Sequence, residues 1–110
     1  MPIKLGKYSF AGPYTSIDQL RNMPGVFGVL CKVQGELFLF DVGESSQLKM
    51  KVENHENKEC WNKNNQGQLQ YYVRYTPFTS QQKRRKVELK LREVFQPTCG
   101  RDIQYMSHRF

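Results

Sequence analysis

Residues 25–45 read GVFGVLCKVQGELFLFDVGES and decide the fold of this 110-residue chain. Apolar, β-compatible residues fill positions 25–33, and a second apolar run begins after Gln34-Gly35. A glycine-containing pair between two such runs predicts a tight hairpin turn. Because both runs are continuous instead of alternating with polar residues, we expect two central strands that helices cover on both faces.

Strand alternation predicts that Leu37, Leu39, Asp41 and Gly43 share one face of the second strand. An acidic side chain would then lie on a face with core leucines, close to the end of the strand. Two roles are open for this carboxylate. It is either a metal ligand or base, or a group that caps the turn into the following helix.

The flanking sequence predicts short elements on both sides of the hairpin. Residues 7–10 form an expected edge strand that Gly12-Pro13 interrupts, and Thr15 or Ser16 can cap a brief helix after it. On the other side, Ser45-Ser46 can cap a helix. Spacing of i, i+4 and i+7 gives that helix an inner stripe of Leu48, Val52 and His55.

The second half of the chain predicts one strand and one long helix. Polar, asparagine-rich residues occupy 57–68, with a mobile loop expected at 62–67, and residues 69–75 (LQYYVRY) predict the third strand. Thr79 or Ser80 can cap a helix that runs to Phe95 and stops at Gln96-Pro97. The expected apolar stripe of this helix is Val87, Leu91, Val94 and Phe95.

The order β-β-α-β-α predicts a small α/β (α+β) domain with helices packed on a mixed or antiparallel sheet. A chain of this length forms one domain, residues 1–110. We expect an N-terminal extension over 1–22, a core over 23–100 and a partly ordered tail over 101–110.

The charge of the chain suits a phosphate-binding surface. Lys and Arg number 17 against 10 Asp and Glu, which gives a net charge of +7 and a sequence pI near 9.5. Many small domains are basic, so charge alone does not establish a partner. Between Gln81 and Arg92, however, six cations surround one carboxylate, a sum of +5, whereas an ordinary solvated helix mixes signs more evenly. The cations predicted to contact nucleic acid are Lys83, Arg84, Arg85, Lys86 and Lys90.

The three cysteines, Cys31, Cys60 and Cys99, are far apart and form no CxxC pair. The two histidines, His55 and His108, do not complete a zinc spacing with them. We therefore expect reduced thiols and a cytoplasmic protein. The N-terminus does not resemble a signal sequence, and no apolar run approaches the roughly 20 residues that span a bilayer, so no membrane partner is expected.

Glu88 is the strongest single candidate for a metal ligand. It borders the apolar stripe of the long helix, where a half-buried carboxylate can face a cleft, and one carboxylate with water and phosphate oxygens can hold Mg²⁺. The alternative is an ion pair within the helix, because Arg92 follows Glu88 at i+4 in the favourable orientation. Spacing alone favours the ion pair.

Aromatic residues and one histidine give weaker signals. His55 is either a proton-transfer group or a group near the end of its helix that suits the helix dipole. Tyr71, Tyr72 and Tyr75 either stack on bases or pack in the structure, and strand tyrosines more often pack. The same alternatives stay open for Trp61.

In order and spacing, these signatures resemble the GIY-YIG nuclease domain over about Met23 to Gly100. Gly25-Val26-Phe27 resembles the first family motif, with phenylalanine in place of tyrosine. Asp41-Val42-Gly43 resembles the second motif, with aspartate in place of tyrosine. Glu44-Ser45 resembles the usual continuation of the second motif.

Three further positions extend the resemblance. Lys51 lies eight residues after Gly43, where the family has an arginine, and His55 matches a common histidine four residues later. Glu88, nine residues before Pro97, matches the metal-binding glutamate, whereas Gly100 replaces a frequent asparagine.

The resemblance implies a three-stranded sheet flanked by helices and metal-assisted hydrolysis of phosphodiester bonds. Glu88 would hold one Mg²⁺ or Mn²⁺, and Asp41 would join it as a ligand or polarise water if the two carboxylates lie close together. Lys51 would keep the positive charge at the phosphoryl group but not the two-pronged donor of arginine. Phe27 cannot transfer a proton.

Three functions are therefore open. The first is a divergent metal-dependent endonuclease that uses Asp41, Lys51, His55 and Glu88. The second is a catalytically inactive module that binds nucleic acid, with DNA the expected form, through its basic helix. The third is a protein-interaction domain whose basic face meets an acidic partner.

Overall fold

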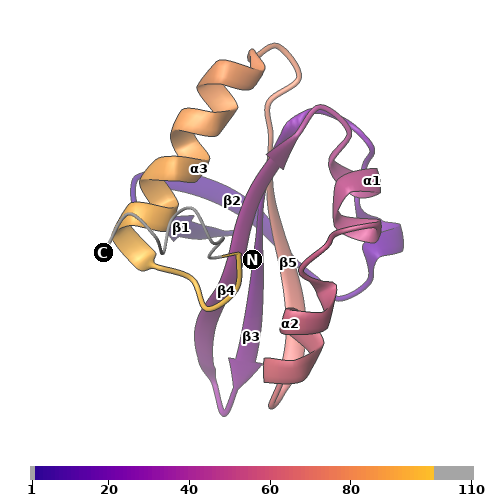
Figure 1. Ribbon diagram of the computed structural model, residues 1–110, viewed down its shortest axis with the longest axis vertical. Coiled ribbons are helices and arrows are strands. Elements are labelled where there is room, and N and C mark those ends of the chain that lie inside the picture. The colour runs from indigo at the N-terminus through magenta and orange to yellow at the C-terminus, as the bar shows by residue number, and fades with distance from the viewer. Residues whose placement is uncertain (1, 101–110) are drawn as a thin grey trace.

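The computed structural model describes residues 2–100, so the tail expected at 101–110 lies outside the described residues. Its centre is a five-stranded antiparallel sheet (Figure 1). The strands are β1 (Ile3–Leu5), β2 (Tyr8–Tyr14), β3 (Gly25–Val33), β4 (Glu36–Ser45) and β5 (Gln68–Tyr75). Their spatial order is β1-β2-β5-β3-β4, which places β3 between β4 and β5 and leaves β4 at an edge.

The expected number of three strands is wrong, because the N-terminal extension adds two. β1 and β2 form a hairpin, and β2 pairs with β5 on the side away from β3. The Gly12-Pro13 pair does not end the strand as expected. Its peptide bond is cis, and β2 continues to Tyr14 with an irregular register opposite β5.

Helices lie on both sides of the sheet. Figure 1 shows α3 (Gln81–Phe95) on one face, with α1 (Leu48–Glu53) and α2 (Lys58–Asn64) on the other. The short 3₁₀ helix η1 (Ile17–Gln19) contacts α1. The predicted loop at 62–67 is wrong at its start, because α2 extends to Asn64. Trp61, which belongs to α2, is buried.

Two of the predicted helix caps are confirmed. Ser16 and Gln19 form a capping box around η1, and Ser80 Oγ accepts a hydrogen bond from Lys83 N at the start of α3. A cap supplies an acceptor for an N–H group that the first turn of a helix leaves unpaired. The end of α3 at Phe95, before Gln96-Pro97, is also confirmed.

β3 separates two hydrophobic cores. Phe27, Val29 and Cys31 point into the core beneath α1 and α2, whereas Val26 and Leu30 point into the core beneath α3. All residues from 25 to 31 are buried. The expectation of two central strands covered on both faces is confirmed for β3 and wrong for β4, which lies at an edge of the sheet and is exposed over its first three residues.

β4 contains a β-bulge that changes which face its side chains occupy. Leu39 pairs with Leu30, but Asp41 pairs with Val29, so Phe40 is an extra residue. Phe40 and Asp41 therefore both lie on the face of the sheet that α1 and α2 cover. Gly43, which pairs with Phe27, lies on the same face. The expectation that Asp41 and Gly43 share a face with Leu37 and Leu39 is wrong.

The inner stripe of α3 also differs from the expected one. Leu91 is buried and Val87 is partly buried, but Val94 and Phe95 are 56% and 40% exposed. Arg84 takes the inner position one turn before Val87 and is 5% exposed. Apolar periodicity does not predict this position, because arginine is not an apolar residue.

Replacing Gly43 by alanine is expected to destabilise the fold, because the new Cβ would lie 2.3 Å from Phe27 Cζ. Overpacking of this kind costs about 1–3 kcal/mol or more of unfolding free energy, which chemical denaturation measures. Gly28→Ala is the matched control, since its nearest neighbour is the Leu30 side chain at 3.3 Å. Equal stability of the two variants would contradict the close packing of Gly43 on Phe27.

Candidate functional site

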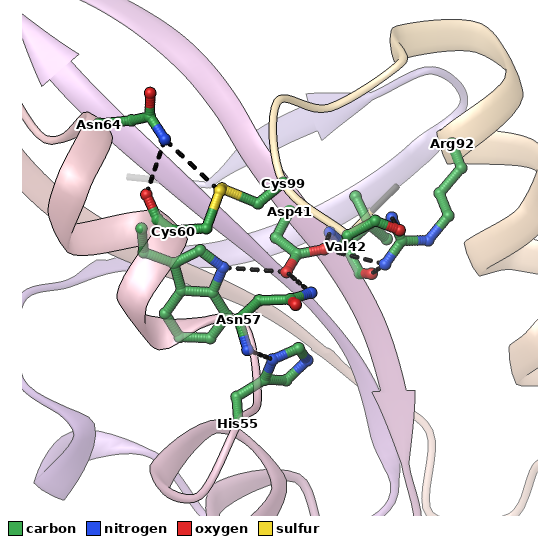
Figure 2. The surroundings of a disulfide bond; sticks show 10 residues. Asp41, Val42, His55, Asn57, Cys60, Asn64, Arg92 and Cys99 are labelled. Carbon is green, nitrogen blue, oxygen red and sulfur yellow. Dashed lines mark hydrogen bonds and ion pairs between the residues drawn. A yellow bond between two sulfur atoms is a disulfide. The ribbon is translucent and has the colours of Figure 1, made fainter. Parts of the chain in front are cut away.

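The Asp41 carboxylate is completely buried and accepts hydrogen bonds from four donors (Figure 2). Oδ1 accepts from Val42 N and Arg92 Nη2, each at 2.9 Å. Oδ2 accepts from Asn57 Nδ2 and Trp61 Nε1, each at 2.9 Å. An ionised carboxylate has about four lone-pair sites, so protein donors saturate Asp41.

Arg92 links this carboxylate to α3. Its Nη2 pairs with Asp41 Oδ1 at 2.9 Å and also donates to the carbonyl of Val42. Its Nε pairs with Glu88 Oε2 at 3.0 Å. The i, i+4 ion pair that spacing favours for Glu88 is confirmed, and the guanidinium lies between the two carboxylates that were candidate metal ligands.

This arrangement does not fit a divalent cation shared by Asp41 and Glu88. Such an ion needs oxygen lone pairs that face it, whereas Arg92 directs its positive charge at both groups. Within residues 2–100, no group of three or more His, Cys, Asp or Glu side chains could hold a metal ion. We derive no chemical step through a metal at this position.

Glu88 is the more accessible of the two carboxylates, with 22% of its side chain exposed. Burial raises the pKa of this carboxyl group above its ordinary value, although the hydrogen bond and charge of Arg92 oppose the rise. The negative charges of Glu44 and Asp41 raise the pKa further. A partly exposed carboxyl group with a raised pKa can exchange a proton with a bound molecule.

Arg84 forms a second ion pair next to this cluster. Its Nε lies 3.0 Å from Glu44 Oε1, and both side chains are less than a tenth exposed. Its Nη1 donates to the carbonyl of Thr79 at 2.6 Å. Of the five cations predicted to contact nucleic acid, Arg84 is thus held inside the fold.

His55 lies just after α1, on the other side of the Asp41 cluster. Its Nδ1 accepts a hydrogen bond from Asn57 N at 3.0 Å, so the neutral ring carries its proton on Nε2. The ring packs 4.8 Å from Trp61 and 5.6 Å from Phe27, measured between centroids. Burial lowers the pKa of His55, Asp41 opposes the change, and the charge of the exposed Lys51 adds to it.

The remaining motif positions have packing roles. A Cβ at Gly25 would lie 2.7 Å from Arg74 O, and Gly43 makes room for the Phe27 ring. Ser45 Oγ accepts from Gln47 N at 3.0 Å in the turn before α1. Close approach of neighbouring groups therefore accounts for both glycines.

A disulfide joins Cys60 of α2 to Cys99, beyond the end of α3. The expectation of three reduced thiols is wrong for this pair, and only Cys31 of the three is unpaired, buried in the core. The two paired cysteines are 39 positions apart, and no short motif signals such a pair. The expectation of a cytoplasmic location loses its support from cysteine usage.

Packing also explains the aromatic residues for which both base stacking and packing were possible roles. Tyr71, Tyr72 and Trp61 are buried, and the hydroxyl of Tyr75 accepts from Arg21 N at 2.8 Å. None of the buried rings can stack on a base without a change in the fold. Among the described residues, the most exposed aromatic side chain is Phe78, which is 99% exposed in the turn before α3.

The other predicted cations divide between two sides of α3. Lys83, Lys86 and Lys90 are exposed, and their i, i+3 and i+7 spacing places them on one side of the helix. Lys7 joins them, since Lys7 and Lys90 line the same hollow of about 280 Å³ between α3 and the β1–β2 turn. We call Lys7, Lys83, Lys86 and Lys90 the lysine flank. Arg85 is exposed on a different side of the helix.

Comparison of the chain with protein-family models, with curated proteins and with solved structures found no match. Among residues 2–100, no helix is both long and apolar enough to cross a membrane. The case for a function therefore depends on the geometry described above.

Replacing Asp41 by asparagine is expected to lower the unfolding free energy by about 3–5 kcal/mol, because Arg92 loses its fully buried charged partner and keeps the partly exposed Glu88. Denaturant titration measures the loss. Asp18→Asn, at an exposed position, is the control and should change stability by less than about 0.5 kcal/mol. A similarly small effect at Asp41 would contradict its role as the acceptor for four donors.

The lowered pKa of His55 makes stability depend on pH. Below about pH 6.5 the unfolded chain takes up a proton at His55 before the folded protein does, so stability falls as the pH drops. Thermal melts of the wild type and of His55→Gln between pH 5.5 and 7.5 test this. The variant should lose less stability over that window, and an equal or larger loss in the variant would refute the assignment.

Proposed function

We propose that this protein binds nucleic acid through the lysine flank, as a divergent GIY-YIG-like domain whose Asp41 and Glu88 stabilise the fold instead of sharing a metal ion. The exposed lysine flank is the observation that carries the proposal. Lysines on one side of a helix neutralise successive phosphates and release bound counterions.

The surroundings of the lysine flank support this function. Lys83 and Lys86 have no acidic residue before them in α3, whose first turn contains no carboxylate. Glu88 and Glu44, which would repel phosphate, are paired with Arg92 and Arg84. The internal ion pairs therefore offset the negative charges of Glu88 and Glu44, and none of these pairs involves a residue of the lysine flank.

Phe78 supplies an exposed aromatic side chain in the turn before α3, the helix that carries Lys83, Lys86 and Lys90. Its turn is fixed by hydrogen bonds from Thr76 N to Pro24 O at 2.8 Å and from Thr79 N to Thr76 O at 3.1 Å. Arg84 also holds the carbonyl of Thr79. A fixed turn that presents a fully exposed ring is suited to stacking on an unpaired base.

Changing Lys83, Lys86 and Lys90 together to glutamine is expected to weaken binding to labelled DNA and RNA strands. The slope of log affinity against log salt should shrink by roughly 0.7–0.9 per lysine that contacts a phosphate. Fluorescence anisotropy at several salt concentrations measures both effects.

A control variant removes the same charge elsewhere, with Lys32, Lys49 and Lys63 changed to glutamine. It should keep most of the affinity and the salt slope. Equal losses in the two triple variants would mean that net charge, and not the lysine flank, determines binding.

Phosphodiester hydrolysis is the second candidate function, and the partial exposure and raised pKa of the Glu88 carboxyl group favour it. A plasmid-nicking assay with Mg²⁺ or Mn²⁺ tests it against Glu88→Gln. Loss of a proton-transfer group should reduce the rate about 100-fold or more. Glu93→Gln, at an exposed position on the same helix, is the control. Nicking that survives Glu88→Gln would remove Glu88 from the reaction.

A further inference from the structure

Residues 97–100, which we call the C-terminal strap, lie along the free edge of β4. Thr98 N donates to Leu39 O at 3.4 Å, and Cys99 N donates to Phe40 O at 2.6 Å. The strap thus pairs with β4 at the bulge, where the sheet would otherwise present unpaired carbonyl groups. Pro97 and Cys99 are buried there.

The strap also covers the Asp41–Arg92 ion pair. The carbonyl of Gly100 accepts from Arg92 Nη1 at 3.3 Å. A Cβ at Gly100 would lie 2.5 Å from Asp41 Oδ1 and 2.6 Å from Arg92 Nη1. The backbone at position 100 therefore lies directly against both charged groups and helps to cover the Asp41 carboxylate, while the Arg92 side chain stays 22% exposed.

The Cys60–Cys99 disulfide fastens this strap to α2 (Figure 2). The other contacts of the strap within the described residues include two backbone hydrogen bonds to β4, one hydrogen bond from Arg92, and the packing of the buried Pro97 and Cys99. Segments at the edge of a sheet open more readily than the centre of a fold. The disulfide adds a covalent restraint between the strap and α2, so its loss makes this opening easier.

We propose that the Cys60–Cys99 disulfide is a redox-controlled latch, whose reduction releases the C-terminal strap and opens the Asp41–Arg92–Glu88 cluster to solvent. In reducing compartments, disulfides of this kind are usually transient or redox-sensing. The proposal goes beyond nucleic-acid binding, since the lysine flank lies on a different side of α3 and is complete in both states.

The reaction is thiol–disulfide exchange with a dithiol reductant. One thiolate of the reductant attacks the Cys60 sulfur, which belongs to the more exposed of the two residues, and expels the Cys99 sulfur. The second thiol of the reductant then closes its own disulfide and releases Cys60. The protein gains two electrons and two protons, and the reductant leaves in its oxidised form.

Amide hydrogen exchange of the full chain, with and without dithiothreitol, tests the latch. Reduction should raise the exchange of the Thr98 and Cys99 amides by a factor on the order of 10², as expected for losing a cross-link. The Val29 amide in the core should keep its protection. Mass spectrometry under both conditions counts the thiols.

Two variants complete the test. Cys60→Ser should exchange rapidly at Thr98 with or without reductant, whereas Cys31→Ser should respond as the wild type does. Unchanged Thr98 exchange in fully reduced wild-type protein would overturn the proposal. So would a rise in exchange at Val29 equal to that at Thr98, because the disulfide would then hold the whole fold and not a strap.

Discussion

The buried carboxylate of Asp41 is the interaction on which the rest of the structure depends. It lies at a bulge in the edge strand β4, and its donors come from β4, from the start and middle of the α2 region, and from α3. The helices on opposite faces of the sheet are therefore tied to one group. A charge in this position is tolerated only because hydrogen bonds and Arg92 compensate for the water it has lost.

Because Asp41 holds the layers of the fold together, the positions that resemble nuclease residues have a structural role here. Of the positions that resemble nuclease residues, His55 and Glu88 both lie close enough to Asp41 for its charge to act on them. Yet Arg92, which no motif predicted, occupies the space between the two acidic groups and binds both. The cluster therefore serves as a connection between layers, and the lysine flank takes no part in it.

Local signals in the sequence predicted much of the fold. Strand β3, the caps at Ser16 and Ser80 and the end of α3 all depend on neighbouring residues, and each is confirmed. The expectations that were wrong concern features that depend on residues far apart in the sequence. The bulge at Phe40 arises from pairing with β3, the disulfide joins segments 39 positions apart, and Arg84 is buried because Glu44 neutralises it. Without the bulge, alternation assigns Asp41 to the wrong face.

The indole N–H of the chain's one tryptophan, Trp61, donates to Asp41 and gives a single NMR signal that reports on this carboxylate. Titration of the oxidised protein with Mn²⁺, whose unpaired electrons broaden nearby resonances, tests the central claim most directly. If protein donors saturate Asp41, the Trp61 indole signal should keep its intensity relative to other buried protons. Selective loss of that signal at low Mn²⁺, abolished by Glu88→Gln, would instead place a metal ion between the two carboxylates and contradict the account.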